Sequence, residues 1–139
     1  MKNESPIGLA LILCDMVIQD KETNKRSLIG MFDRLYTAQF PCIHPAMYVY
    51  VSATSGKGDY DTAIICRHQA SGQRVLAING KIRFADPLQV VEVVCHIQRP
   101  KFDEPGEYWL EFCIDEIPVM MRRLIIEQAA PPANRNGRN

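Results

Sequence analysis

Short apolar segments separated by turn-forming residues recur from one end of the chain to the other. Each is bounded by Gly, Pro, Asp or Ser, and no convincing helical pattern exceeds two turns. Short strands at regular spacing with turn signals between them are typical of a sandwich or barrel rather than of a parallel α/β sheet. The predicted strands are residues 9–18, 28–36, 46–54, 60–68, 74–84, 89–98, 107–115 and 118–127.

The segment at 107–115 narrows the choice of fold. Gly106 lies two residues before Tyr108, after an acidic turn and at the start of an alternating strand. In immunoglobulin-like sandwiches this arrangement forms a tyrosine corner, in which the tyrosine hydroxyl bonds to nearby backbone. The next inward position is Leu110 instead of a cysteine, which excludes a disulfide-bearing antibody-type domain. We therefore predict an all-β fold, an antiparallel β-sandwich of about eight strands, immunoglobulin-like or related.

The length of the chain fits one domain. It has 139 residues, 47% of them hydrophobic, which suffices for a single well-packed core. We assign residues 1–127 to the sandwich. Residues 128–139 contain two adjacent prolines, two arginines and no acid, and this composition predicts a disordered tail.

Six apolar residues, Leu9 to Cys14, precede Asp15 and show no alternation. An export signal, a lipid-modification site and a strand covered on both faces are the three interpretations of such a run. A signal peptide needs a basic start, but Glu4 balances Lys2 and Pro6 interrupts the segment. The run is also too short to span a bilayer. We interpret it as the first half of a hairpin, with turn formers near Asn24, and expect a cytoplasmic protein without membrane contact.

Charge narrows the class of partner. Sixteen basic and sixteen acidic side chains give a formal net charge of zero, which removes the overall attraction to nucleic acids and anionic membranes. A neutral chain also associates easily. We expect a protein partner or self-association, and no nucleic acid.

The cysteines and histidines form no recognisable site. Cys66 and His68 share a strand face and could hold zinc if another pair came near, but structural zinc sites usually contain close pairs such as CxxC. No nucleophile elbow, phosphate loop or HExxH helix is present either. We expect reduced, mostly buried thiols, surface histidines and no cofactor or metal. The cysteines are Cys14, Cys42, Cys66, Cys95 and Cys113.

Two acids in the first hairpin form a more specific candidate. If the turn centres near Asn24, Asp15 and Asp33 lie roughly opposite one another, with Arg34 adjacent. Like charges across a ladder are destabilising, so this register needs a cation, an arginine or a shared proton. Two carboxylates are few for a calcium or magnesium site, and a slipped register explains them equally well.

A second candidate is a partner-binding surface of aromatic and basic residues. Alternation places Trp109 on the polar face of its strand, and Arg122 and Arg123 lie near the last strand. Tryptophan and arginine are enriched at protein interfaces. Solvated arginines and a packed tryptophan are the alternative interpretation.

The first hairpin and the connector after it resemble a family of small bacterial proteins whose function is uncharacterised. The shared pattern is CD-x-VI-x-D, then SLIG-x-FDRL, then FP-x-x-HP, and "GDYD" at 58–61 and "EPGEY" at 104–108 are also similar. The matching positions are Cys14, Asp15, Ile18, Asp20, Ser27, Leu28, Ile29, Gly30, Phe32, Asp33, Phe40, Pro41, His44 and Pro45.

The resemblance implies a single β-rich cytoplasmic domain and brings no known activity, substrate or catalytic residue. It makes one group of positions the candidates for a shared functional motif, namely Cys14, Asp15, Asp33, Arg34 and His44. Our leading hypothesis is a non-catalytic interaction or assembly module. The alternative is a small metal-dependent binder or enzyme that uses Asp15 and Asp33.

Overall fold

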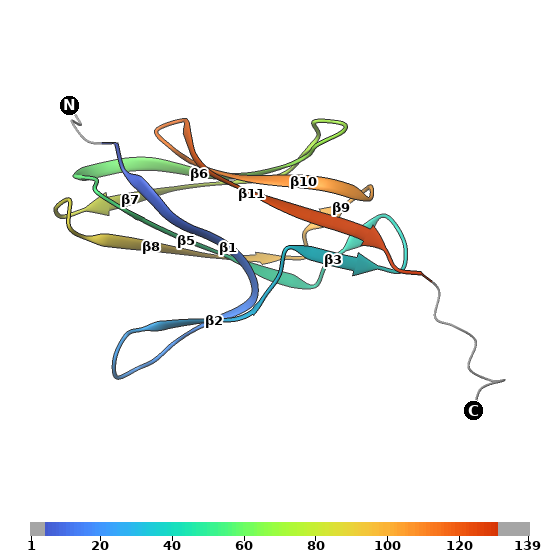
Figure 1. Cartoon of the computed structure of the whole chain (residues 1–139), viewed down its shortest axis with the longest axis horizontal. Coiled ribbons are helices and arrows are strands. Elements are labelled where there is room, and N and C mark those ends of the chain that lie inside the picture. Colours follow the sequence, from blue (N-terminus) through green and yellow to red (C-terminus); the bar gives the residue numbers. More distant parts are fainter. Residues whose placement is uncertain (1–4, 131–139) are drawn as a thin grey trace.

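The protein is a sandwich of two sheets. The structure, a computed structural model, describes residues 5–130, which contain strands and no helix. One sheet has the order β2-β1-β5-β8 and the other the order β3-β11-β10-β6-β7, with a small β4-β9 pair beside them (Figure 1). The strands are β1 (Ile7–Gln19), β2 (Arg26–Met31), β3 (Arg34–Thr37), β4 (Cys42–Ile43), β5 (Ala46–Thr54), β6 (Gly58–His68), β7 (Arg74–Phe84), β8 (Val90–Gln98), β9 (Lys101–Phe102), β10 (Gly106–Ile114) and β11 (Ile117–Gln128).

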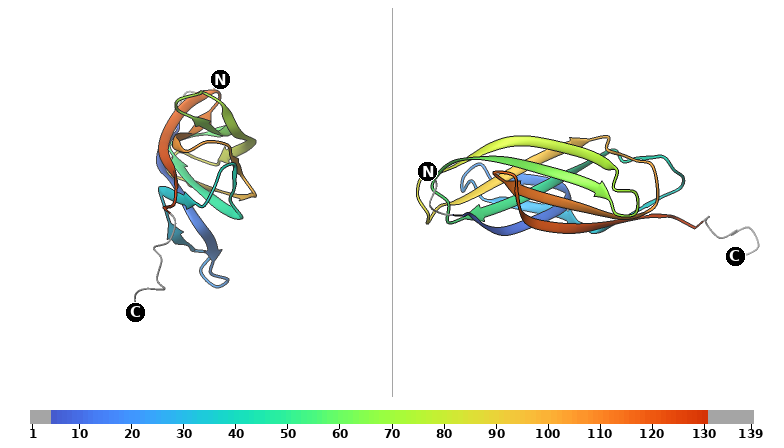
Figure 2. Two further views of the ribbon diagram at one scale, coloured as in Figure 1. Left: turned by 90° about the vertical axis from the view of Figure 1, so that its right-hand side faces the viewer. Right: turned by 90° about the horizontal axis from the view of Figure 1, so that it is seen from above.

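The predicted all-β sandwich is confirmed, and its pairing is antiparallel except where β3 joins β11 in parallel. Apolar side chains from both sheets fill the space between them and form one continuous core. Figure 2 shows this body elongated along its strands. The largest fully buried side chains include Phe84, Phe102, Phe112, Leu13 and Met47.

The predicted strand at 28–36 is two strands that belong to different sheets. Its first part, β2, pairs with β1, whereas its second part, β3, pairs with β11. Phe32 and Asp33 lie between the two parts and carry the chain from one sheet to the other. The hydrophobic segment is continuous in the sequence although its two halves pair in different sheets.

Strand β1 is shared between the sandwich and a hairpin that leaves it. Its first part, Ile7 to Cys14, pairs with β5, and from Cys14 to Gln19 it pairs with β2. We call residues 15–31 the arm. Figures 1 and 2 show the arm standing away from the body of the sandwich.

The non-alternating run at the start of β1 has a simple structural explanation. Leu11 and Leu13 are buried in the core, Ile12 is half-buried, and Leu9 is exposed. The register with β5 shifts between Gly8 and Ala10. This stretch therefore begins the first hairpin, as we predicted, and its inner side chains belong to the core while Leu9 is exposed.

The C-terminal boundary differs slightly from the prediction. Gln128, assigned to the tail, is the last residue of β11, and its side chain donates to Ala38 O at 3.1 Å. Ala129 N–H donates to Thr37 O at 2.7 Å. Residues 131–139 of the predicted tail lie outside the described residues.

Candidate interaction surfaces

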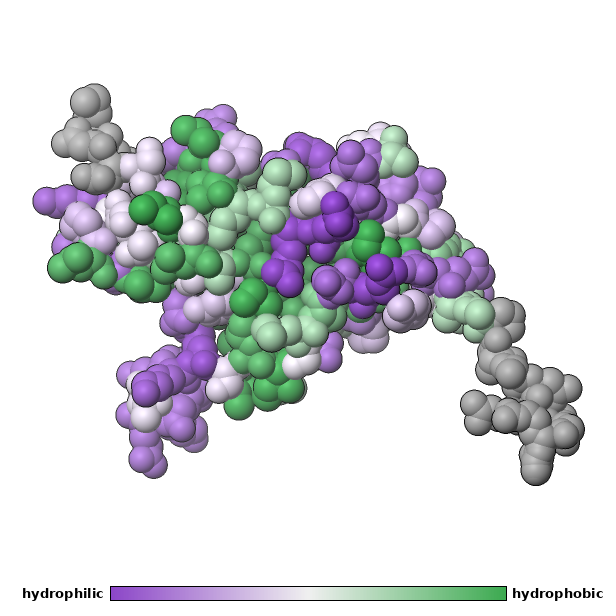
Figure 3. Space-filling model, in the orientation of Figure 1, coloured by the Kyte–Doolittle hydropathy of each residue, from purple (hydrophilic) through white to green (hydrophobic). Residues whose placement is uncertain are grey.

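One face of the arm carries large apolar side chains that are exposed. Met16 pairs with Ile29 and Cys14 with Met31, so these side chains and that of Ile18 lie on the same face. The exposed fractions are 48% for Met16, 47% for Ile18, 46% for Ile29 and 64% for Met31. Figure 3 shows apolar surface gathered where the arm joins the sandwich. We call these four side chains the arm face.

The opposite face of the arm is turned toward the sandwich and tethered to it. Arg26 Nη1 lies 2.6 Å from Glu92 Oε1 on β8. The hydroxyl of Tyr50, on β5, donates to the other oxygen of the same carboxylate. Val17 and Leu28 on this face are half-buried. The inner face of the arm thus carries its contacts with the sandwich, and the arm face lies on the other side.

A second surface lies on the outer face of the other sheet. Trp109 on β10 is flanked by its register partners, Arg67 on β6 and Arg123 on β11. The Arg123 guanidinium lies 4.9 Å from the centroid of the indole ring. Glu107 Oε2 accepts from Trp109 Nε1 at 2.6 Å and lies 3.2 Å from Arg123 Nε. We call these four residues the Trp109 platform.

Arg122 does not belong to the platform. Its register partner is Leu110, so its side chain lies on the opposite face of the sheet. There Nη1 donates to Leu11 O at 3.1 Å, linking β11 to β1, while the buried Nε has no hydrogen-bond partner within residues 5–130. Of the three residues predicted to bind a partner, the structure brings Trp109 and Arg123 together and separates Arg122.

The register of the hairpin separates the two acids that the sequence placed opposite each other. Cys14 pairs with Met31 and Met16 with Ile29, so Asp15 lies opposite Gly30. Gly30 has a φ of 70°, and the Asp15 carboxylate fills the space that a Cβ at this position would need. Asp33 lies outside the hairpin pairing, and its carbonyl accepts from Ile125 N–H at 3.0 Å.

The other residues of the family motif also have separate structural roles. Arg34 pairs with Glu127 on β11. His44 N–H donates to Pro100 O at 3.0 Å, and its ring lies 6.2 Å from that of Phe32. Cys14 is fully buried, and burial raises the pKa of its thiol. No group of three His, Cys, Asp or Glu side chains suited to a metal ion occurs within residues 5–130.

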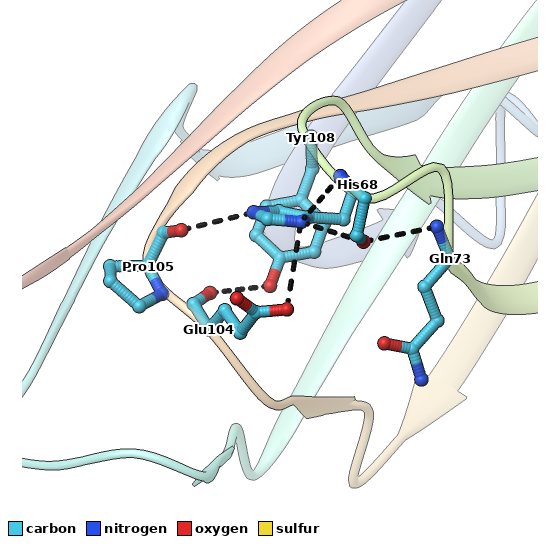
Figure 4. A network of polar contacts seen from close by, with 6 residues as sticks. His68, Gln73, Glu104, Pro105 and Tyr108 are labelled. Atoms are coloured by element: carbon cyan, nitrogen blue, oxygen red, sulfur yellow. Dashed lines mark hydrogen bonds and ion pairs between the residues drawn. The ribbon is translucent and has the colours of Figure 1, made fainter.

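A buried polar network surrounds the tyrosine corner (Figure 4). Tyr108 donates to Glu104 O at 2.5 Å, which confirms the predicted corner. The His68 ring lies 4.8 Å from that of Tyr108 and is 5% exposed, so the expectation of a surface histidine is wrong here. His68 Nε2 lies 3.0 Å from Pro105 O, and Nδ1 lies 2.9 Å from Ser71 Oγ.

The histidine in this network is structural. A carbonyl can only accept, so Nε2 donates to Pro105 O and, in the neutral ring, Nδ1 accepts from Ser71. Both ring nitrogens are engaged, which leaves neither available as a general base or a zinc ligand. The adjoining pocket of about 170 Å³ is lined by His68, Gln73, Arg74, Val75, Lys101, Asp103, Glu104 and Tyr108.

None of the five cysteines forms a disulfide, so all five are free thiols, as predicted. Burial raises the pKa of Cys66 to about 12 and also raises that of Cys95. Such thiols are poor nucleophiles, because the thiolate is the reactive form. The structure therefore places them as packing residues.

The described part of the chain has no helix long and apolar enough to cross a bilayer. The fold is similar to a part of a β-glucosidase from Listeria innocua. In its isofagomine complex the TM-score is 0.52 with 9% sequence identity, and the match covers 91% of this chain and 16% of the enzyme. A second structure of that β-glucosidase gives a TM-score of 0.51, 9% identity and coverage of 90% and 16%. At this identity the likeness shows the fold alone.

No curated protein matches the sequence. The family of unknown function DUF6941 matches residues 9–127, which include both sheets and the arm. The chain belongs to the DUF6941 family.

Proposed function

We propose that the protein is a non-catalytic, cytoplasmic interaction module that binds a protein partner, or a second copy of itself, through the arm face. The observation that supports this proposal is the exposure of Met16, Ile18, Ile29 and Met31 on one face of a projecting hairpin. Contiguous apolar patches on a small domain commonly mark interaction sites.

Burial of the arm face can supply part of the free energy of binding. Complete burial of one such side chain contributes about 1.5–3 kcal/mol. Each member of the arm face is roughly half exposed, so a partner that covers all four adds about 3–6 kcal/mol before the costs of association. Additional contacts from the partner are needed for tight binding.

The alternative of a metal-dependent function at Asp15 and Asp33 has weaker support. Asp15 lies over Gly30, and the backbone of Asp33 serves the junction with β11. A site for a hard cation needs more oxygen ligands than this pair supplies.

The proposal can be tested with an Ile29→Ser/Met31→Ser double variant and a Leu88→Ser control. Leu88 is 91% exposed but lies in the loop before β8, outside the arm. Sedimentation velocity over a range of concentrations will show whether the wild-type chain self-associates. Self-association that the double variant loses and the control keeps supports the proposal.

If the wild-type chain is monomeric, the partner is a different protein. A photo-crosslinking amino acid at position 29 should then give one discrete adduct in cells that express the chain. The same amino acid at position 88 should not give that adduct. A monomeric chain that forms no specific adduct from position 29 overturns the proposal.

A further inference from the structure

We infer that the Trp109 platform binds an acidic segment of a partner protein, whose carboxylates pair with Arg67 and Arg123 and whose chain packs on the indole. This site is on the outer face of the β3-β11-β10-β6-β7 sheet, whereas the arm extends from the other sheet. The inference therefore goes beyond the proposed function, and either can fail alone.

The platform lies on paired strands, and side-chain contacts hold three of its members, Trp109, Glu107 and Arg123, in place. Strand β10 is paired on both sides, with β6 and β11. Trp109 is half-buried and held by the bond from its Nε1 to Glu107. The same carboxylate holds Arg123, so the cation and the ring keep a fixed relation. Rigid tryptophan and arginine side chains are the commonest hot spots of protein interfaces.

The charge of the platform is only partly neutralised locally, because Arg123 pairs with Glu107 whereas Arg67 does not pair with an acid of the described chain. Glu107 is already shared between Trp109 and Arg123. Arg67 makes no ion pair with any acid within residues 5–130. Glu111 lies on the same face, but Oε1 of its carboxylate lies 3.9 Å from Cys113 Sγ, further along β10. Two guanidinium groups thus flank the indole with one engaged carboxylate between them.

At the far end of the same face, basic and acidic side chains pair with one another. There Arg83 lies 3.2 Å from Asp59, and Lys81 lies 2.9 Å from Asp61. Arg67, whose guanidinium has no ion pair within residues 5–130, therefore lies at the platform end of this face, away from these paired charges. A long polyanion such as a nucleic acid would extend over these aspartates, whereas a short acidic segment fits within the platform.

The two guanidinium groups favour carboxylates as ligands. A guanidinium can bind a carboxylate through two parallel N–H···O hydrogen bonds, which is a stronger contact than a lysine ammonium makes. Two side chains that point to one side of an extended segment lie about 7 Å apart. An aspartate or glutamate at alternate positions can reach Arg67 and Arg123 while the backbone crosses Trp109.

The test uses a property of the chain itself, because Trp109 is its only tryptophan. We would titrate the full chain with a hexaglutamate peptide at low ionic strength and follow intrinsic tryptophan fluorescence. A saturable change in emission that salt reverses is expected. The Arg67→Gln and Arg123→Gln variants should each weaken the apparent affinity about five- to tenfold.

An Arg83→Gln variant is the matched control. It removes one positive charge from the same sheet, but at the end where Arg83 pairs with Asp59. It should bind hexaglutamate as the wild type does. Equal weakening in all three variants indicates a non-specific charge effect and overturns the inference. Unchanged urea unfolding midpoints will show that the Arg67 and Arg123 variants fold.

Two further probes identify the ligand class. Hexalysine should leave the emission unchanged. Inorganic phosphate at the same concentration of charge should have little effect, and if it reproduces the change the site is a general anion site and the inference is wrong. No response to hexaglutamate also overturns it. In either case the arm-face experiments are unaffected.

Discussion

Arg26 and Glu92 are separated by 66 positions in the sequence, yet they form the ion pair that ties the arm to the sandwich, with 2.6 Å between Nη1 and Oε1. Their side chains are 27% and 31% exposed. Tyr50 donates to the same carboxylate. This ion pair is thus a polar contact that joins the inner face of the arm to a strand distant in the sequence.

We predict that Arg26→Gln loosens the arm without unfolding the domain. Partly exposed ion pairs contribute about 0–1 kcal/mol, so the free energy of unfolding should change little. Hydrogen exchange in residues 15–31 should become faster. Arg83→Gln, which breaks the exposed pair with Asp59, is the control and should leave the arm unchanged. Unaltered exchange in Arg26→Gln would mean that other contacts hold the arm.

Tyr108→Phe should destabilise the fold by about 0.5–1.5 kcal/mol, the usual net contribution of one hydrogen bond. Tyr108 is buried and its hydroxyl donates to Glu104 O, and the substitution removes this bond. Urea unfolding measures the loss. Tyr36→Phe is a suitable control because Tyr36 is 66% exposed. Equal stability of the two variants would contradict a structural role for the corner.

Gly106→Ala should be more destabilising than Gly58→Ala. Both glycines have positive φ, 125° and 89°, so either substitution strains the backbone by about 1–2 kcal/mol. At Gly106 the new Cβ would also lie 3.2 Å from His68 Nε2, whereas at Gly58 it meets nothing within 4 Å. Thermal unfolding of both variants tests this order, and a reversed order would show that the His68 network yields easily.

Arg122→Met should be neutral or slightly stabilising, whereas Arg122→Ala should destabilise. The buried Nε of Arg122 has no partner within the described chain, and such a group carries a desolvation cost of about 1–3 kcal/mol. Methionine keeps most of the packing volume and removes this cost. Unfolding in urea distinguishes the outcomes. A loss of more than about 1 kcal/mol in Arg122→Met would show that its bond to Leu11 O outweighs the cost.

Stability should fall as the pH rises above about 8.5, the ordinary pKa of a cysteine thiol. Burial raises the pKa of Cys66 to about 12, so between these values the unfolded chain loses a proton that the folded chain retains. The linkage amounts to about 2 kcal/mol at pH 10 for this thiol. Urea midpoints at pH 7 and pH 10 measure the effect. Cys66→Ala should lose less stability between the two pH values than the wild type.

The tyrosine corner could be predicted because its signal is local. Gly106 and Tyr108 lie close together at the start of β10, and the φ of 125° at residue 106 is one that glycine adopts readily. The first hairpin could also be predicted, but not its register. The turn closes through Asp20, whose Oδ1 accepts from Glu22 N–H at 2.7 Å and Thr23 N–H at 3.0 Å. This loop pairs Gln19 with Arg26 and moves Asp15 opposite Gly30 instead of Asp33.

The division of the segment at 28–36 into β2 and β3 had no local signal. Each half pairs with a strand from a distant part of the sequence, β2 with β1 and β3 with β11. The burial of His68 was missed for the same reason. Its partners Pro105 and Glu104 lie in another loop, and a polar residue can be buried wherever such partners are supplied.

The sequence by itself determined the all-β class, most of the strands, the tyrosine corner and the absence of disulfides among the five cysteines, because alternation, turn chemistry and cysteine spacing are properties of short segments. Only the tertiary structure decided which side chains share an exposed surface. It turned Met16, Ile18, Ile29 and Met31 outward on the arm, placed Arg67 beside Trp109, and moved Arg122 to the opposite face of the sheet. Those outcomes depend on register and on pairing between distant strands, where a shift of one residue changes the face on which every side chain lies.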